Sequence, residues 1–387
     1  MAKRWIKRRT FGLIAALTVI ILILHVWNQE DGAIKEASME MKPIPAECAC
    51  SDNYNRSYDF CYTLPENRSI RGRRFSCEHL PKLAELGLLE TSNLSFVGGD
   101  FSSDPVFVTA FSRNHAREAK NLIRTIKRYF GDRYVVVYDL GRVNTSWFKE
   151  WKFLEFRSFN FSEYPKYFRK LRDYRWKPII IAKTLQEFGA IWYMDSSIVF
   201  KKGDLSHVYE LVKCRRVVSE RPPLMSTTQR DLREAQTTHE DGWNIEHWKE
   251  NIAECRKAAY LMHGYTGHGI YPATSPEVYK FIPTNFTEIK KPKAKMYEAG
   301  FVFAVQTKDT IEEILKWYVL CALERDCMAG NGHEHLGCFF KQSQFSSSPT
   351  CHRFDQSVVN LLAANAFWYD RHYYVSEIVD FFNVRRM

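Results

Sequence analysis

The chain has 387 residues, of which 45% are hydrophobic, 15% aromatic and 26% charged. This balance is typical of a globular protein and excludes a wholly disordered or collagen-like chain. The net charge is +10, but Lys and Arg at positions 3–9 supply half of this excess. The remaining charge is spread over the rest of the chain, so the sequence does not favour a nucleic-acid-binding protein.

An apolar run without charged residues follows the basic cluster, at residues 11–27. In a helix, with a rise of about 1.5 Å per residue, this run spans about 25 Å, near the lower limit for crossing a bilayer. A basic cluster followed by an apolar run predicts a cytosolic tail at 1–10, an uncleaved signal anchor at 11–27 and a luminal remainder. A cleaved signal peptide and a buried core helix are the alternatives.

The cysteines and the glycosylation sequons also favour a luminal location. There are ten cysteines, an even number that an oxidising compartment would pair into disulfides. Asn-x-Ser/Thr sequons occur six times, more often than chance predicts. The sequon asparagines are Asn55, Asn67, Asn93, Asn144, Asn160 and Asn285.

Residues 28–104 predict a luminal stem with a small cysteine-bearing subregion, because their apolar periodicity is poor and four cysteines lie close together. A short helix is expected at 78–89. Gly98, Gly99 and the pair Asp104-Pro105 mark the boundary to a domain that extends over 105–387.

From residue 105 the pattern alternates between apolar strands and amphipathic helices, which predicts an α/β fold with a largely parallel sheet. Asn114 is the expected N-cap of the first helix, and Thr310 with Glu313 forms an expected capping box. Strands are expected at 105–111, 134–138, 153–161, 191–194 and 301–305, and helices at 115–130, 178–188, 310–323 and 355–365.

Three short motifs place polar or small residues beside apolar strands or at a helix start. Asp195 ends an apolar strand, Gly300 opens another, and Asp355-Gln356 begins a helix. Ligands bind beyond the carboxyl ends of parallel strands, so these residues are candidates for a site. A strand-end turn, a bulge glycine and an N-cap are the respective structural alternatives.

The order and spacing of these motifs resemble the GT-A glycosyltransferases, particularly the glycogenin-like and bacterial galactosyltransferase-like branch. That pattern is a strand ending in Asp-x-Asp, a small-Gly-aliphatic strand, and Asp-Gln with Asn five residues after the Asp. The chain also resembles a nematode-rich group of luminal glycosyltransferase-like proteins, which share Val-Thr-Ala-Phe, Trp-Lys-Pro and His-Arg-Phe/Tyr-Asp-Gln segments. The resemblance covers residues 105–370.

The resemblance implies a role for each matching residue. Asp195 would contact the nucleotide ribose and a divalent cation, and Lys177, 18 residues before it, would contact the diphosphate. Gly300 would let a sugar approach, and Asp355 and Gln356 would face the anomeric carbon. The base and the ribose would be lined by Thr109, Ala110 and Ser112.

The implied cofactor is a divalent cation, Mn²⁺. Ser197 stands where the family has its second Asp, which removes one charge from the metal site. Ser197 and His372 are further candidate ligands, although the family's His-x-x-Gly setting is absent around His372. A zinc site built from Cys327, His333, His335 and Cys338 is disfavoured, because its spacing is loose.

The sequence thus predicts a Golgi or ER type II membrane enzyme. It would transfer a hexose from a nucleotide sugar, UDP-linked in our interpretation, to a hydroxyl of a glycan or glycoprotein. The alternative is a catalytically inactive relative that binds glycans or scaffolds other luminal enzymes, which Ser197 would favour. A basic nucleic-acid binder is a third hypothesis, and the luminal signals argue against it.

Overall fold

The computed structural model describes residues 44–94, 104–213, 241–330 and 337–386. The described residues from 46 onward form one compact unit. Within the described ranges, no helix combines the length and the apolar character needed to span a membrane. The predicted anchor at 11–27 lies outside these ranges.

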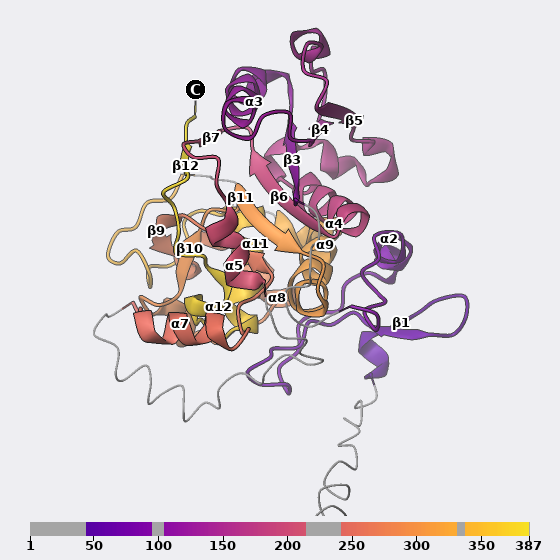
Figure 1. The fold of residues 1–387 in the computed structure, drawn as a ribbon. Helices are drawn as coiled ribbons and strands as arrows, with labels where there is room; N and C mark the ends of the chain where they lie inside the picture. Colours follow the sequence, from indigo (N-terminus) through magenta and orange to yellow (C-terminus); the bar gives the residue numbers. More distant parts are fainter. Residues whose placement is uncertain (1–43, 95–103, 214–240, 331–336, 387) are drawn as a thin grey trace, which may run out of the picture. The chain divides into compact units, whose positions relative to one another are not determined.

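A six-stranded mixed sheet forms the centre of the unit, with the strand order β5-β4-β3-β6-β11-β8 (Figure 1). The first four strands in this order are parallel, and β11 runs antiparallel to both of its neighbours. The expected parallel α/β core is therefore present, with an antiparallel edge. The strands are β3 (Val106–Phe111), β4 (Val135–Asp139), β5 (Leu154–Ser158), β6 (Ala190–Asp195), β8 (Tyr260–Leu261) and β11 (Phe301–Val305).

One face of this sheet packs against three helices of the larger hydrophobic core. Tyr193 on β6 and Val302 on β11 belong to this core, together with apolar side chains of all three helices. Helix α4 is followed by its C-cap, Gly189, whose positive φ of 72° suits a residue without a side chain. The helices are α4 (Trp176–Phe188), α9 (Lys316–Leu323) and α11 (Asp355–Ala366).

The opposite face packs against α3 (Ala116–Phe130) and α5 (Ser206–Val212). Trp192 of β6 lies at the centre of this second core, where it contacts Phe301, Phe303 and Phe381. The last of these precedes a short strand, β12 (Phe382–Val384), that pairs antiparallel with β7 (Ile198–Phe200). This pairing brings residues 382–386 beside the segment that follows Asp195.

Shorter elements complete the unit. A second antiparallel pair joins β9 to β10, and the hairpin of β1 and β2 lies in the cysteine-bearing subregion. The bounds are β1 (Ala49–Ser51), β2 (Ser57–Asp59), α2 (Leu80–Glu85), α7 (Ile245–Ala253), β9 (Tyr265–Gly269), α8 (Pro276–Phe281), β10 (Lys295–Tyr297), α10 (Arg325–Met328) and α12 (Arg371–Tyr374).

Residues 46–94 differ from the predicted stem, because their aromatic side chains are part of the main core. Phe75 stacks on Phe281 of α8, and Tyr62 packs edge-on against Trp317 of α9. The described residues 46–94 therefore belong to the same compact unit as the sheet. Poor local periodicity concealed this packing, since the partners are more than 200 residues away in the sequence.

Disulfides confirm the prediction that the cysteines are paired. The described pairs are Cys48–Cys61, Cys50–Cys77, Cys321–Cys327 and Cys338–Cys351, and Cys255 is also disulfide-bonded. The zinc hypothesis fails on chemistry, since Cys327 and Cys338 each belong to a disulfide and offer no thiolate.

Two helix starts differ from the prediction. Helix α3 follows a 3₁₀ turn at Arg113–His115, so Asn114 lies inside that turn and is not the N-cap. A π-helical segment, Thr310–Leu315, precedes α9, and Thr310 is buried within it. The hydroxyl of Thr307 accepts from the backbone N–H of Thr310, a role that the predicted capping box had given to Thr310 itself.

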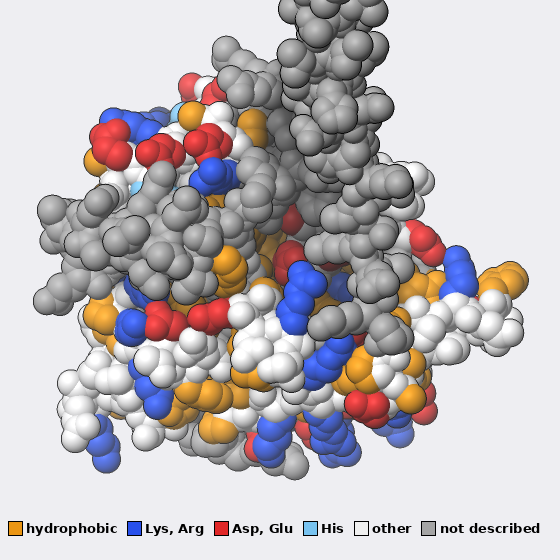
Figure 2. Space-filling model, turned by 90° about the horizontal axis from the view of Figure 1, so that it is seen from below, with side chains coloured by type: hydrophobic (Ala, Val, Ile, Leu, Met, Phe, Trp, Pro, Cys, Tyr) orange, Lys and Arg blue, Asp and Glu red, His pale blue; other side chains and the backbone are white. Residues whose placement is uncertain are grey.

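Charges of both signs are interspersed on the face shown in Figure 2. Exposed lysines commonly lie three residues from a glutamate on the same helix or turn, as in Glu277–Lys280, Glu288–Lys291 and Glu246–Lys249. Such exposed pairs contribute less than about 1 kcal/mol each to stability, and they also balance much of the surface charge locally.

Candidate active site

The ammonium group of Lys177 joins two carboxylates that are 160 residues apart in the sequence. Its Nζ lies 2.6 Å from Oδ2 of Asp355 and 3.1 Å from Oδ1 of Asp195. All three residues were predicted site residues, and the structure brings them together at the carboxyl end of β6.

Each member of this cluster comes from a different element. Asp195 is the last residue of β6, Lys177 lies in the first turn of α4, and Asp355 is the first residue of α11. Helix α4 immediately precedes β6 and runs antiparallel to it. The first turn of α4 therefore lies at the carboxyl end of β6. An ionised Asp355 is also favoured by the positive end of the α11 dipole.

Burial and charge act against each other in this cluster. The side chains of Lys177 and Asp355 are only 3% and 5% exposed, whereas that of Asp195 keeps 33% of its surface exposed. Burial alone would lower the pKa of Lys177, but the two carboxylates outweigh burial and raise it. Burial raises the pKa of Asp355, and Lys177 opposes that rise. Asp195 is thus the member that a ligand can reach most directly.

Gly300 is adjacent to Asp195 across the sheet. The backbone N–H of Asp195 donates to the carbonyl of Gly300 at 2.7 Å. A Cβ atom at position 300 would lie 2.6 Å from Oδ2 of Asp195, well inside van der Waals contact. The absence of a side chain at position 300 therefore makes room for the carboxylate of Asp195.

Asn360 and Gln356 show how α11 is fixed. The side-chain amide of Asn360 donates to the carbonyl of Tyr297 and accepts from its N–H, which attaches α11 to β10. Gln356 is 6% exposed, and its Nε2 has no hydrogen-bond partner among the described residues. A buried amide donor without a partner is costly, so Gln356 is suited to donate to a bound ligand.

Two residues next to the cluster have left-handed backbone conformations. Tyr174, three residues before Lys177, has a φ of 53°, and Phe354, directly before Asp355, has a φ of 47°. Their rings lie 6.4 Å apart. Non-glycine residues in this region cost of order 1 kcal/mol or more, and such strain concentrates at functional sites.

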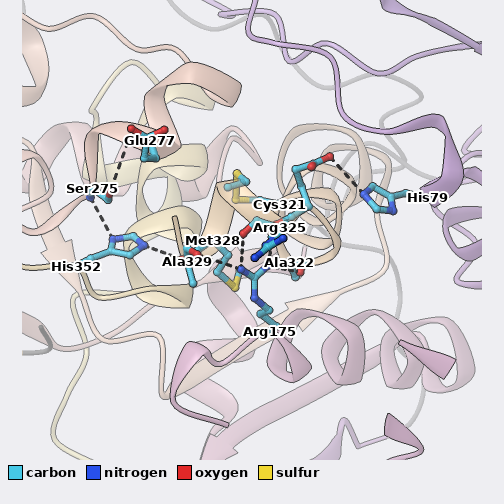
Figure 3. The surroundings of a disulfide bond; sticks show 12 residues. His79, Arg175, Ser275, Glu277, Cys321, Ala322, Arg325, Met328, Ala329 and His352 are labelled. Atoms are coloured by element: carbon cyan, nitrogen blue, oxygen red, sulfur yellow. Dashed lines mark hydrogen bonds and ion pairs between the residues drawn. A yellow bond between two sulfur atoms is a disulfide. The ribbon is translucent and has the colours of Figure 1, made fainter. Parts of the chain in front are cut away.

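Arg175 fixes the start of α4 from within the protein (Figure 3). Its guanidinium is buried and donates to the carbonyls of Ala322, Glu324 and Arg325 at 2.7–2.8 Å. These carbonyls belong to the loop that the Cys321–Cys327 disulfide closes. The position of Lys177, two residues after Arg175, is thereby tied to that loop.

The three residues predicted to line the nucleotide lie at different places. Ala110 pairs with Asp195 across the parallel ladder, so it is adjacent to the cluster. Thr109 is fully buried, and strand alternation turns its side chain to the opposite face of the sheet from Ala110. Ser112 lies past the end of β3, partly exposed, and its hydroxyl donates to Asn114.

The donor set around Asp195 does not fit a divalent cation. Its oxygens already contact Lys177 and the hydroxyl of Tyr193, and Ser197 offers no carboxylate. His372 accepts from the N–H of Asn244 through Nε2, and its Nδ1 lies 2.6 Å from Asp370. Two clusters of the described residues have metal-binding spacing, and neither contains Asp195. His372 belongs to one of them, together with His247 and Asp370.

Sequence reasoning missed several residues around the cluster. Tyr193 donates to Oδ1 of Asp195 at 3.1 Å, and its position two residues before Asp195 on one strand face was a usable signal. Tyr174 and Arg175 carry no comparable signal, because their partners lie far away in the sequence.

A family profile described as a protein of unknown function, DUF1647, matches residues 48–182. The matched region runs from the cysteine-bearing subregion to α4 and includes Lys177. A search of curated proteins finds no match.

Similar solved structures include three proteins whose titles name them as glycosyltransferases or a mannan synthase. The bifunctional glycosyltransferase WbbM is 12% identical over 70% of this chain, with a TM-score of 0.35, and the chain spans 40% of its length. The galactosyltransferase LgtC, solved with donor and acceptor sugar analogues, is 12% identical over 66% of this chain and 70% of its own, with a TM-score of 0.30. Core-mannan synthase A from Aspergillus fumigatus, in an Mn/GDP form, is 10% identical over 73% of both chains, with a TM-score of 0.30. These TM-scores are too low to assign an activity by comparison.

Proposed function

We propose that the protein is a glycosyltransferase that moves a hexose from a UDP-linked donor to a hydroxyl of a glycan or glycoprotein. The observation that carries this proposal is the convergence of Asp195, Lys177 and Asp355 at the carboxyl end of β6. Open α/β sheets bind their ligands at this edge. The order of the motifs along the chain, which resembles the GT-A pattern, points to the same chemistry.

The proposed reaction breaks one bond, forms another and transfers one proton. The bond between the anomeric carbon and the phosphate oxygen breaks, and its electron pair leaves with the diphosphate. The acceptor oxygen forms the new bond to the anomeric carbon and loses its proton. Asp355, a buried carboxyl whose pKa is raised by burial, is suited to take that proton, because a base works best when its pKa approaches the working pH.

The other residues would bind and orient the substrates. In the proposed complex, Asp195 contacts the ribose of the donor, and Lys177 holds Asp195 and Asp355 at a fixed separation. The amide of Gln356 donates to the donor sugar. Such positioning contributes to the rate by holding the reacting atoms close together before reaction.

We propose the location as well: a Golgi or ER membrane, with residues 11–27 as a type II anchor and the sheet domain in the lumen. The disulfides and the surface positions of the sequon asparagines support an oxidising, glycosylating compartment.

The test is a screen of the full-length chain, purified in detergent, against a panel of nucleotide hexoses. Release of the nucleotide diphosphate is measured with and without a mixture of glycan acceptors. Turnover of one donor that disappears in Asp195→Asn would support the proposal. The replacement of the family's second Asp by Ser197 favours one alternative, a non-catalytic glycan-binding relative. Glycan binding without turnover of any donor would establish that alternative.

A further inference from the structure

The charge balance of the active site leaves it ill suited to an anionic ligand. Lys177 contributes one positive charge, and it faces two carboxylates. Glu298, two residues before Gly300, adds a further acidic group near this edge. A nucleotide diphosphate would therefore meet an excess of negative charge unless another cation were present.

Strand β12 brings two arginines to this place. Its pairing with β7 sets Val384 opposite Ile198, and the backbone N–H of Arg385 donates to the carbonyl of Ser197 at 2.7 Å. The ladder thus ends beside the residue that replaces the family's second metal-binding Asp. Arg385 and the next residue, Arg386, are both exposed to solvent at this point.

A long contact with Glu298 places the charge of Arg386 at this edge of the sheet. Its guanidinium Nη2 lies 4.0 Å from Oε2 of Glu298, and this long, exposed contact leaves the side chain 69% exposed. Its charge also lowers the pKa of Tyr174, although burial is the larger effect and raises that pKa overall. Asp355, Lys177 and Asp195 act on the same tyrosine. The contact with Glu298, two residues before Gly300, is the geometric link between Arg386 and this edge of the sheet.

We propose that Arg385 and Arg386 neutralise the diphosphate of the donor and that the site works without a divalent cation. This inference rests on the proposed transferase function. Guanidinium groups bind phosphate oxygens through paired hydrogen bonds, and they remain charged at every physiological pH. With the two arginines, the charged side chains at this edge, including Glu298, sum to zero, so the diphosphate no longer meets an excess of negative charge. Mn²⁺ brings a site with two aspartates to the same balance.

The test measures binding of UDP to the full-length chain by calorimetry, once in EDTA and once in 1 mM Mn²⁺. Inorganic pyrophosphate serves as a second probe that carries only the diphosphate. We expect the dissociation constant for UDP in EDTA to be within about threefold of that in Mn²⁺. The double variant Arg385→Ala/Arg386→Ala should weaken binding of both probes at least tenfold.

A matched control is available at the other end of the same ladder. Lys201→Ala/Lys202→Ala removes two exposed positive charges next to Phe200, the last residue of β7, and should leave UDP binding unchanged. Arg385→Lys/Arg386→Lys keeps both charges and should restore most of the affinity. Loss of UDP binding in the control variant would show that general surface charge, and not these two arginines, binds the probe.

The remaining outcomes separate this inference from the proposed function. UDP binding that requires Mn²⁺ would overturn the inference and leave the transferase function standing. Binding in EDTA that the arginine variants do not weaken would remove Arg385 and Arg386 from the site. If neither probe binds under either condition, both the inference and the proposed function are wrong.

Discussion

Gly300, the residue directly before β11, lies beside Asp195 at the end of β6, and a side chain at position 300 would occupy the space of the Asp195 carboxylate. We therefore expect Gly300→Ala to displace this carboxylate from Lys177. Because the displaced atoms are the end of a side chain, the fold should survive, while UDP binding should fall at least tenfold. Gly264→Ala is the control, since its nearest neighbour would be 3.7 Å away. Equal UDP binding in wild type and Gly300→Ala would show that Asp195 does not contact the ligand.

Asp195→Asn and Asp355→Asn each remove one carboxylate from Lys177 and leave the other in place. Since the ammonium keeps one charged partner, we expect the melting temperature to fall only modestly in each variant. Turnover should fall at least a hundredfold, because one variant loses a ligand contact and the other loses the proposed base. Asp132→Asn, at an exposed carboxylate remote from this cluster in the fold, is the control. Turnover that persists in Asp355→Asn would reduce that residue to a structural partner of Lys177.

Arg175→Met should destabilise the protein by about 3 kcal/mol or more. The change leaves the carbonyls of Ala322, Glu324 and Arg325 without this donor, and each such loss costs about 1 kcal/mol or more. Denaturant unfolding measures the effect. Arg172→Met replaces an exposed arginine of the same segment and should change stability by less than about 0.5 kcal/mol. Similar losses in both variants would contradict the anchoring role of Arg175.

His263 should make the stability of the protein depend on pH. Burial lowers its pKa to about 3, whereas the unfolded chain has a histidine pKa near 6.5. Between these values the unfolded chain binds a proton that the folded protein does not, so stability falls as the pH falls. The slope from this residue is at most about 1.4 kcal/mol per pH unit.

His263→Phe, which suits the surrounding aromatic rings, should remove this contribution. The free energy of unfolding, measured at pH 4.5, 5.5 and 6.5, should then decline less steeply than in wild type. His207→Gln alters a partly exposed histidine and serves as the control. Parallel pH curves for wild type and His263→Phe would contradict the prediction.

The sequons should carry glycans when the full chain is expressed in a secretory cell. Five of the six asparagines are exposed and Asn285 is partly exposed, so none needs the protein to unfold before modification. Digestion with an endoglycosidase should shift the band on a gel, and Asn144→Gln should reduce that shift by one step. An unshifted wild-type band would place the chain outside the secretory pathway.

The strands of the sheet were predictable because parallel strands that are buried on both faces appear in a sequence as continuous apolar runs. The same logic located Asp195, since a polar residue at the end of such a run lies at the edge of the sheet. The sequence interval between Lys177 and Asp195 consists of one helix, a turn at Gly189 and one strand, which brings the two residues to the same edge of the sheet. Local pattern was sufficient for Asp195, whereas Lys177 was predicted through the resemblance to the GT-A pattern.

Other parts of the site depend on contacts that no local pattern encodes. The partners of Arg175 lie about 150 residues away, and the strand that brings Arg385 to Ser197 has only three residues. The placement of Thr109 was a different kind of error. Strand alternation alone would have put Thr109 on the opposite face from Ala110, so the sequence contained the information needed.

The link between Arg175 and the loop of Cys321 and Cys327 has a practical consequence for producing the protein. Without this cross-link, the carbonyls that hold the start of α4 would lose a covalent constraint, and the ammonium group at its first turn would lose positional order. Preparations made in a bacterial cytoplasm, where thiols stay reduced, should fold poorly or bind nucleotide weakly for this reason. We therefore expect oxidative folding to matter for the proposed binding site as well as for the fold.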